Sequence, residues 1–151
     1  MSRIEGVDNL IKKLNNLGGN SVAVVEKSIQ QSTSLVLRDA KKNAPVNKKS
    51  GGGTLRQSIQ AETYVSSEGV QGKVFTNCEY APYVEYGTGQ RGAASPSPPK
   101  SPENIKYSTD WNGMTAQPYL YPALAVNKEV IKEKLRADLR NAIRKHGGLD
   151  D

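Results

Sequence analysis

Two short runs of alternating apolar and polar residues limit what this chain can fold into. The alternation runs through residues 57–65 and returns in residues 69–77, with turn-forming residues at 66–69 between them. A two-stranded hairpin is only marginally stable alone in water, so its apolar face must be covered by other elements. The sequence therefore predicts an antiparallel pair of strands that packs against helices.

Two long segments have the apolar spacing of amphipathic helices and can supply that cover. In residues 21–43 apolar side chains recur every three or four positions until Pro45 ends the pattern. Residues 122–145 carry the clearest stripe, opened by a proline and followed by two glycines. A third, shorter helix is predicted around residues 7–17.

The predicted fold class is α+β, with a small antiparallel sheet packed against a long helix in the N-terminal half and a C-terminal helix. A chain of 151 residues supplies one ordinary domain. We predict that residues 1–145 form this single domain and that residues 146–151 form a flexible tail.

The remaining segments have the composition of long loops. Residues 46–54 are rich in Lys and Gly, and residues 87–102 contain four Pro and three Gly, so no regular structure is expected in either. The second loop has almost no large apolar side chain to bury. We predict that it contacts other subunits or a neighbouring ring and is disordered in an isolated monomer. A compact aromatic segment at 80–86 precedes it, and a short third strand is predicted within 106–114.

The chain is basic, and the excess charge lies in its first part. It has 21 Lys and Arg against 15 Asp and Glu, and residues 1–60 hold ten of the basic and four of the acidic side chains. A cluster of basic residues could line a channel for DNA and attract phosphates without reading sequence. Its members are Lys41, Lys42, Lys48, Lys49 and Arg56. The alternatives are an ordinary solvated basic face and a nucleic-acid-binding accessory domain.

Residues for catalysis or metal binding are scarce. The single histidine, His146, lies in the predicted tail, and the single cysteine excludes an internal disulfide and multi-cysteine metal sites. Neither glycine cluster has the context of a phosphate-binding loop. We therefore predict no catalytic residue, metal or cofactor.

No stretch of the sequence has the length and hydrophobicity of a membrane span. The roughly 18 consecutive apolar residues that a span requires do not occur, and polar residues interrupt the first 19 positions where a signal peptide would lie. We expect a protein that is assembled inside a cell and has no membrane partner.

Four separate motifs follow one another along the chain. They are Ala44-Pro45, the segment Gly53–Ile59, the segment Tyr80–Thr88 and the segment Gln117–Leu124. In this order they resemble the HK97-gp10-like family of head-tail joining or tail-completion proteins from long-tailed phages and prophages. The resemblance extends over residues 1–145. The chain departs from the family pattern at Ser50–Gly53, where a run of glycines stands, and at Tyr119, where the family commonly has Phe.

The resemblance implies a structural subunit of the phage neck. Such a subunit forms a homo-oligomeric ring, a hexamer in the expected case, that joins or completes the head-tail connection around the DNA channel. Its expected partners are the head-side connector and the tail-tube or terminator proteins, with non-specific passage of DNA. The expected location is the virion neck or tail after assembly in the host cytoplasm, and no catalysis is implied.

Tyrosines in two short proline-containing segments are candidates for the contacts between subunits. Tyrosine offers large, rigid, amphipathic contact area, which suits interfaces. The predicted interface residues are Tyr80, Tyr83, Glu85, Tyr86, Gly87, Thr88, Arg91, Tyr119 and Tyr121. The alternative is that these tyrosines only cover a thin core from one side.

Overall fold

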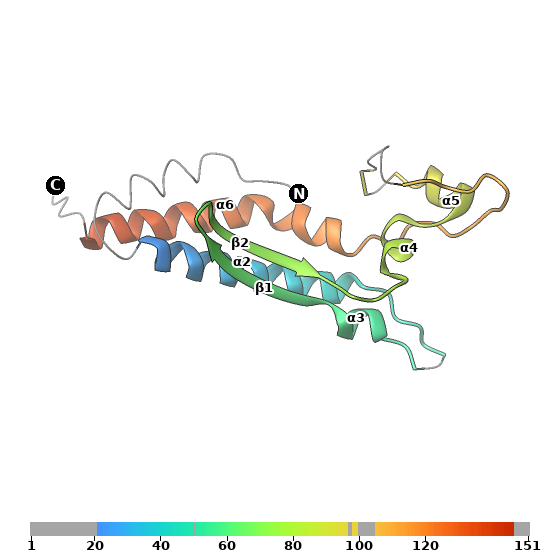
Figure 1. Cartoon of the computed structure of the whole chain (residues 1–151), viewed down its shortest axis with the longest axis horizontal. Coiled ribbons are helices and arrows are strands. Elements are labelled where there is room, and N and C mark those ends of the chain that lie inside the picture. The colour runs from blue at the N-terminus through green and yellow to red at the C-terminus, as the bar shows by residue number, and fades with distance from the viewer. Residues whose placement is uncertain (1–20, 50, 97, 100–104, 147–151) are drawn as a thin grey trace. The chain divides into compact units, whose positions relative to one another are not determined.

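The structure, a computed structural model, describes residues 21–49, 51–96, 98–99 and 105–146 (Figure 1). Its elements are α2 (Ser21–Asn43), α3 (Thr54–Ser58), β1 (Gln60–Ser66), β2 (Gly69–Phe75), α4 (Ala81–Tyr86), α5 (Gly89–Ala94) and α6 (Leu120–His146). The two strands form one antiparallel sheet, so the described part of the chain is α+β as predicted. The helix predicted at 7–17 lies outside the described residues.

The described residues form two compact units. The first unit contains residues 21–35, 61–73 and 127–146, and the second contains the described residues within 36–60 and 74–126. The chain passes from one unit to the other within α2, within α6 and near one end of the hairpin. Each unit has its own buried side chains and is described by itself.

The core of the first unit joins α2, α6 and the hairpin. Val25, Leu135 and Leu139 are buried at its centre, and Ile29, Val70 and Ile143 pack against them. Residues four apart share one face of a helix, so the apolar stripes predicted for both helices face this core. Full burial of one such side chain contributes about 1.5–3 kcal/mol to stability.

Gly72 brings β2 very close to α2. A Cβ atom at this position would lie 1.9 Å from Thr33 Oγ1 and 3.1 Å from Cγ2 of Ile29. The Thr33 hydroxyl is itself fixed, because it donates a hydrogen bond of 2.7 Å to the carbonyl oxygen of Ile29. The hairpin therefore approaches the helix closely at a strand position that has no side chain.

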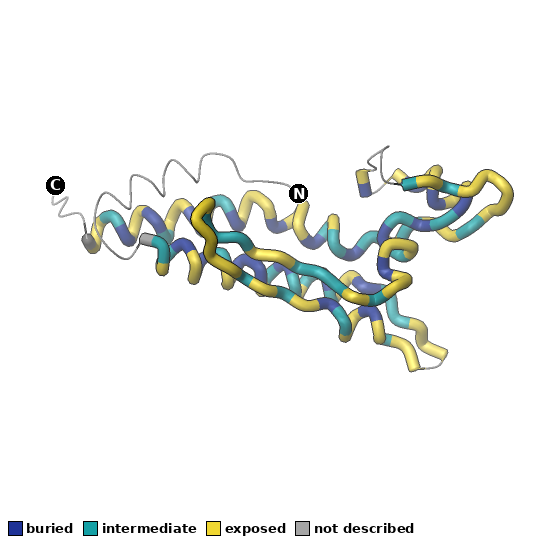
Figure 2. Tube along the Cα trace, viewed as in Figure 1, coloured by how far each residue is buried: buried dark blue, intermediate teal, exposed yellow. Residues whose placement is uncertain are grey.

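Side-chain pairs on the other face of the hairpin define its register. The Tyr64 hydroxyl donates to Oε1 of Gln71 at 2.7 Å, and Lys73 Nζ lies 3.7 Å from Glu62 Oε1. Both pairs connect β1 to β2 directly across the ladder. Most of β1 is exposed (Figure 2).

The core of the second unit is built largely from small residues. Its buried apolar residues are Val36, Ala40, Ala44, Leu55, Ile59, Ala81, Tyr119 and Ala123. Alanines on α2, α4 and α6 leave room for the backbones to approach one another, while Tyr119, only 1% exposed, is the largest fully buried side chain. Tyr119 therefore supplies the largest fully buried side chain of a core built mostly from smaller residues.

The strand predicted at 57–65 begins later than expected. Residues 57 and 58 belong to α3, and β1 starts at Gln60. Gly53, with φ of +108°, reverses the chain before α3, the Leu55 side chain is buried, and the Ser58 hydroxyl donates to the Leu55 carbonyl at 2.8 Å. These local contacts favour one helical turn over two more strand residues.

Other boundaries also differ from the predictions. Residues 89–94 form α5, so the prediction that 87–102 lacks regular structure is wrong there, and the aromatic segment at 80–86 is largely the helix α4. The third strand predicted within 106–114 is wrong, since that segment contributes one isolated bridge between Met114 and Thr88. The last helix begins at Leu120 and includes His146, which the sequence had placed in the tail.

Candidate assembly surface

Glu85 ties α4 to the start of α6. Its side chain is buried, with 5% of the residue exposed. Oε2 accepts hydrogen bonds from the backbone N–H groups of Tyr119 at 2.8 Å and Leu120 at 3.0 Å, and Oε1 accepts one from Tyr121 at 2.9 Å. The first N–H groups of a helix have no partners within it, and a negative charge there interacts favourably with the helix dipole. The Glu85 carboxylate therefore caps α6 from a distant part of the chain.

Tyr119 lies beside this cap. Burial, followed by the negative charge of Glu85, raises the pKa of the Tyr119 phenol, so the ring stays neutral at physiological pH. Glu85 and Tyr119 were both predicted to contact other subunits. The structure buries them inside the chain, which gives them an internal role and leaves the exposed aromatic residues as the candidates for contact.

Four aromatic side chains of the second unit are largely exposed. The exposed fractions are 59% for Tyr83, 56% for Trp111, 45% for Tyr80 and 43% for Tyr121. Large aromatic rings are enriched in protein interfaces because they bury much area with little loss of conformational entropy. Three of these residues were predicted from the sequence, whereas Trp111 was not.

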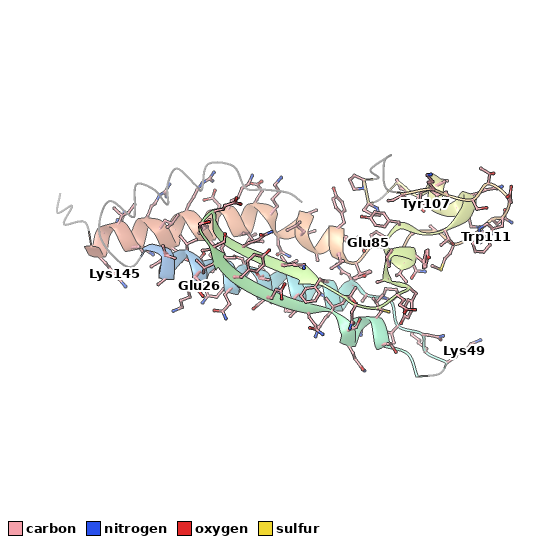
Figure 3. The ribbon with its side chains drawn as sticks, viewed as in Figure 1. Glu26, Lys49, Glu85, Tyr107, Trp111 and Lys145 are labelled. Atoms are coloured by element: carbon pink, nitrogen blue, oxygen red, sulfur yellow. The ribbon has the colours of Figure 1, made fainter. Side chains whose placement is uncertain are left out.

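Tyr83 and Trp111 also line an open groove of about 550 Å³. Pro82, Tyr83 and Tyr86 of α4 line the groove, as do Tyr107 and Trp111 of the loop that follows α5. Figure 3 labels Tyr107 and Trp111. The Tyr107 hydroxyl donates to the carbonyl oxygen of Tyr86 at 2.9 Å, which joins the loop to α4. Burial, with a smaller effect of Tyr86, raises the pKa of this phenol.

Two backbone segments beside the groove cross and are joined by hydrogen bonds. Thr88 and Met114 exchange two hydrogen bonds, from Thr88 N to Met114 O at 2.8 Å and from Met114 N to Thr88 O at 3.0 Å. Gly87, Gly89 and Gly113 have φ of +73°, +59° and +67° at this crossing. A Cβ on Gly113 would lie 1.9 Å from the Thr88 carbonyl oxygen, so only glycine allows the two segments to meet.

Arg91 and the other predicted interface positions surround this crossing. Arg91 lies on α5 and is exposed, and its backbone N–H donates to the carbonyl of Asn112 at 2.9 Å. Gly87 is buried and Thr88 half-buried. The segment Tyr80–Arg91 and the loop around Trp111 therefore form one surface, which we call the aromatic surface.

The predicted basic cluster lies at the end of α2 and in the following loop. Lys41 and Lys42 occupy the last turn of α2, where positive charge suits the helix dipole. Lys48 and Lys49 are exposed in the loop between α2 and α3, where Figure 3 labels Lys49. Arg56 has an internal role as well, since its Nη2 donates to the carbonyl of Ala44 at 2.8 Å.

The described residues offer little for metal binding or for crossing a membrane. Among them no group of three or more His, Cys, Asp or Glu side chains is placed to hold a metal ion. Within the same residues no helix is long and apolar enough to cross a membrane. The features that stand out in the described part of the second unit are exposed aromatic rings and clustered ammonium groups.

Sequence reasoning missed Tyr107 and Trp111 because it assigned their segment to a strand. The signal that could have found them is Gly113, which follows two aromatic residues in a segment with poor alternation. An isolated glycine there indicates a close backbone approach more than a strand interior.

A comparison with protein families finds a match for this chain. Residues 8–87, more than half of the 151, match the family described as "Bacteriophage HK97-gp10, putative tail-component". The matched range is shorter than the 1–145 expected from the motifs. It includes α2, the hairpin and α4, whereas Trp111, Tyr119 and α6 lie beyond it. Comparisons with curated proteins and with solved structures found no significant match.

Proposed function

Because the chain belongs to the HK97-gp10-like family of bacteriophage tail components, we propose that it is a structural subunit of the phage neck. In this proposal copies of the chain form a ring, a hexamer in the simplest case, which joins the head to the tail or completes the tail. The DNA passes through the ring. The neighbours are the head-side connector and the tail-tube or terminator proteins, and assembly takes place in the host cytoplasm.

The aromatic surface is the observation that carries the proposal. Tyr83 and Trp111 expose more than half of their area, and they line one groove together with the less exposed Tyr107. Exposed rings grouped in this way mark protein contact sites, and buried aromatic anchors dominate the energetics of interfaces. A second copy or a neighbouring ring would cover them.

The basic cluster supports passage of DNA. Lys42, Lys48 and Lys49 are exposed at or after the end of α2, and Lys41 is half-buried beside them. Ammonium groups attract phosphates through charge alone, which suits a channel that must let every sequence slide. Nothing in this role requires catalysis, and we propose none.

A complementation experiment tests the proposed function. A phage or prophage that lacks this gene should accumulate separate heads and tails, or incomplete tails, visible by negative-stain electron microscopy. The wild-type gene supplied on a plasmid should restore joined particles, whereas the double variant Tyr83→Ala, Trp111→Ala should not. Val130→Ala is the matched control, because Val130 of α6 is also 56% exposed but lies in the first unit. Normal joining without the gene would refute the proposal.

The alternative is an accessory domain that binds nucleic acid, and the basic cluster is the observation that favours it. Such a domain would bind duplex DNA tightly, and binding would weaken steeply with salt. Replacing Lys48 and Lys49 with Ala should then remove about two units from the slope of log K against log salt. A channel subunit should show weak binding and should still join particles after this change.

A further inference from the structure

We infer that the outer edge of β1 pairs with β2 of a second copy, so that the sheet continues from one subunit to the next. The inference rests on the proposed ring and names one contact within it. It is carried by the register of the hairpin, by backbone groups of β1 that have no partner among the described residues, and by the charges of the two strands.

The register shows which backbone groups of β1 point away from β2. The pairs Tyr64–Gln71 and Glu62–Lys73 place a two-residue turn between Ser66 and Gly69. Paired residues of an antiparallel ladder alternate between hydrogen-bonded and non-bonded pairs, and a two-residue turn closes on a bonded pair. Glu62 and Tyr64 therefore bond to β2.

Ala61, Thr63 and Val65 lie between these positions and direct their N–H and C=O groups outward. Among the described residues no backbone hydrogen bond joins any of the three to another element. Val65 is 47% exposed, and Ala61 and Thr63 are half-buried. Three donors and three acceptors in a row are thus available to another strand.

The edge also lacks the usual protection against such pairing. Edge strands in natural proteins are commonly blocked by Pro, by Lys or by a bulge. β1 contains neither Pro nor Lys, and its only charged side chain is Glu62, which pairs with Lys73. An added strand would also give the outward N–H and C=O groups of β1 hydrogen-bond partners.

The charges of the strands indicate which strand is added. β1 carries the acidic Glu62, and β2 carries the basic Lys73 as its only charged residue. Pairing β1 with β2 of a second copy in the register used within the chain places Glu62 opposite Lys73, whereas a second β1 has no basic residue to place opposite Glu62. Contact between two different edges is also heterologous, and such contacts repeat around a ring when the rotation closes.

Proline substitution on β1 tests the inference. In Thr63→Pro the outward N–H is lost, while the bonds of Glu62 and Tyr64 to β2 remain. Thr63→Ala is the matched control, because it removes the side chain and keeps the N–H. Sedimentation velocity of the full-length protein over a range up to about 1 mM should show a concentration-dependent oligomer for wild type and Thr63→Ala. Thr63→Pro should raise the dissociation constant at least about tenfold, with an unchanged circular dichroism spectrum.

Val65→Pro provides a second variant nearer the turn, in case Thr63→Pro fails to fold. The inference is overturned if a folded proline variant associates as tightly as wild type, or if the wild-type protein stays monomeric over the whole range. Failure of the proposed function has a different readout, since it appears as joined particles in the absence of the gene. The two results are therefore distinguishable.

Discussion

Removing the Glu85 carboxylate should destabilise the protein more than any other loss of one acidic side chain in the described part of the chain. In Glu85→Ala, three N–H groups at the start of α6 lose their acceptor. A hydrogen bond to a charged group contributes about 1.5–3 kcal/mol, and a buried donor left unpaired costs about 1–3 kcal/mol. The N–H of Tyr119 is buried and the other two are partly buried, so water can replace part of the loss. We expect the free energy of unfolding to fall by about 3–5 kcal/mol.

Glu85→Gln removes the charge of the side chain and keeps its shape. The amide keeps one oxygen that can accept hydrogen bonds, but it places an NH₂ group against at least one backbone donor and loses the interaction with the helix dipole. We expect a smaller loss of about 1–2 kcal/mol. Urea unfolding followed by circular dichroism at 222 nm would measure both variants.

Glu79→Ala is the control for this series. Glu79 precedes α4 and is exposed, so its removal should change stability by less than about 0.5 kcal/mol. If Glu85→Ala unfolds within the same margin of wild type, the capping role assigned to Glu85 is wrong.

Three further variants test other features. Ser32→Ala should stabilise the protein by about 1 kcal/mol, because the buried Ser32 hydroxyl has no hydrogen-bond partner among the described residues, whereas Ser34→Ala on the exposed side of α2 should change stability little; denaturant midpoints of the two variants would show the difference. Gly113→Ala should cost at least about 2 kcal/mol, since its φ is positive and its Cβ would clash with backbone, and a rise in melting temperature would contradict this. A hydrogen bond from Lys134 lowers the pKa of the Asp138 carboxyl in the folded protein. The ionised carboxylate therefore stabilises the fold above its unfolded pKa, and this contribution is lost as pH falls from about 4. In Asp138→Asn the free energy of unfolding, measured against pH, should fall less steeply in acid.

The long elements could be predicted from the sequence because they repeat one signal many times. The apolar stripes of α2 and α6 each extend over several turns, and the alternation of β1 and β2 is clear enough to reveal the hairpin. The apolar stripes of the two helices pack against each other, since Val25 and Leu135 are buried in the same cluster.

The short helices could not be predicted in the same way. α3 and α5 have five and six residues, fewer than two turns, so no apolar period can develop. Their conformations depend on single contacts, such as the bond from Gly92 N to Thr88 O at 2.9 Å. Hydrogen bonds of this kind leave little trace in composition.

Only part of the candidate surface could be predicted from the sequence, and the reason is related. Exposed Tyr80, Tyr83 and Tyr121 follow from an unusual cluster of tyrosines, but the role of Glu85 depends on N–H groups 34 to 36 positions away along the chain. A sequence pattern carries no signal for a partner at that distance. The contact-surface role of the remaining residues stays a prediction.

The close approach of Gly72 to α2 couples two positions that are far apart in the chain. A methyl group at 72 would overlap the Thr33 hydroxyl at 1.9 Å, and the next atoms of that side chain and of Ile29 lie at 3.1–3.2 Å. Gly72→Ala should therefore be harmful alone and much less harmful together with Thr33→Ala, giving a double-mutant cycle with an interaction energy between about 0.5 and 3 kcal/mol. Relatives of this chain that carry a larger residue at the first position should carry a smaller one at the second, so the pair would vary together during evolution.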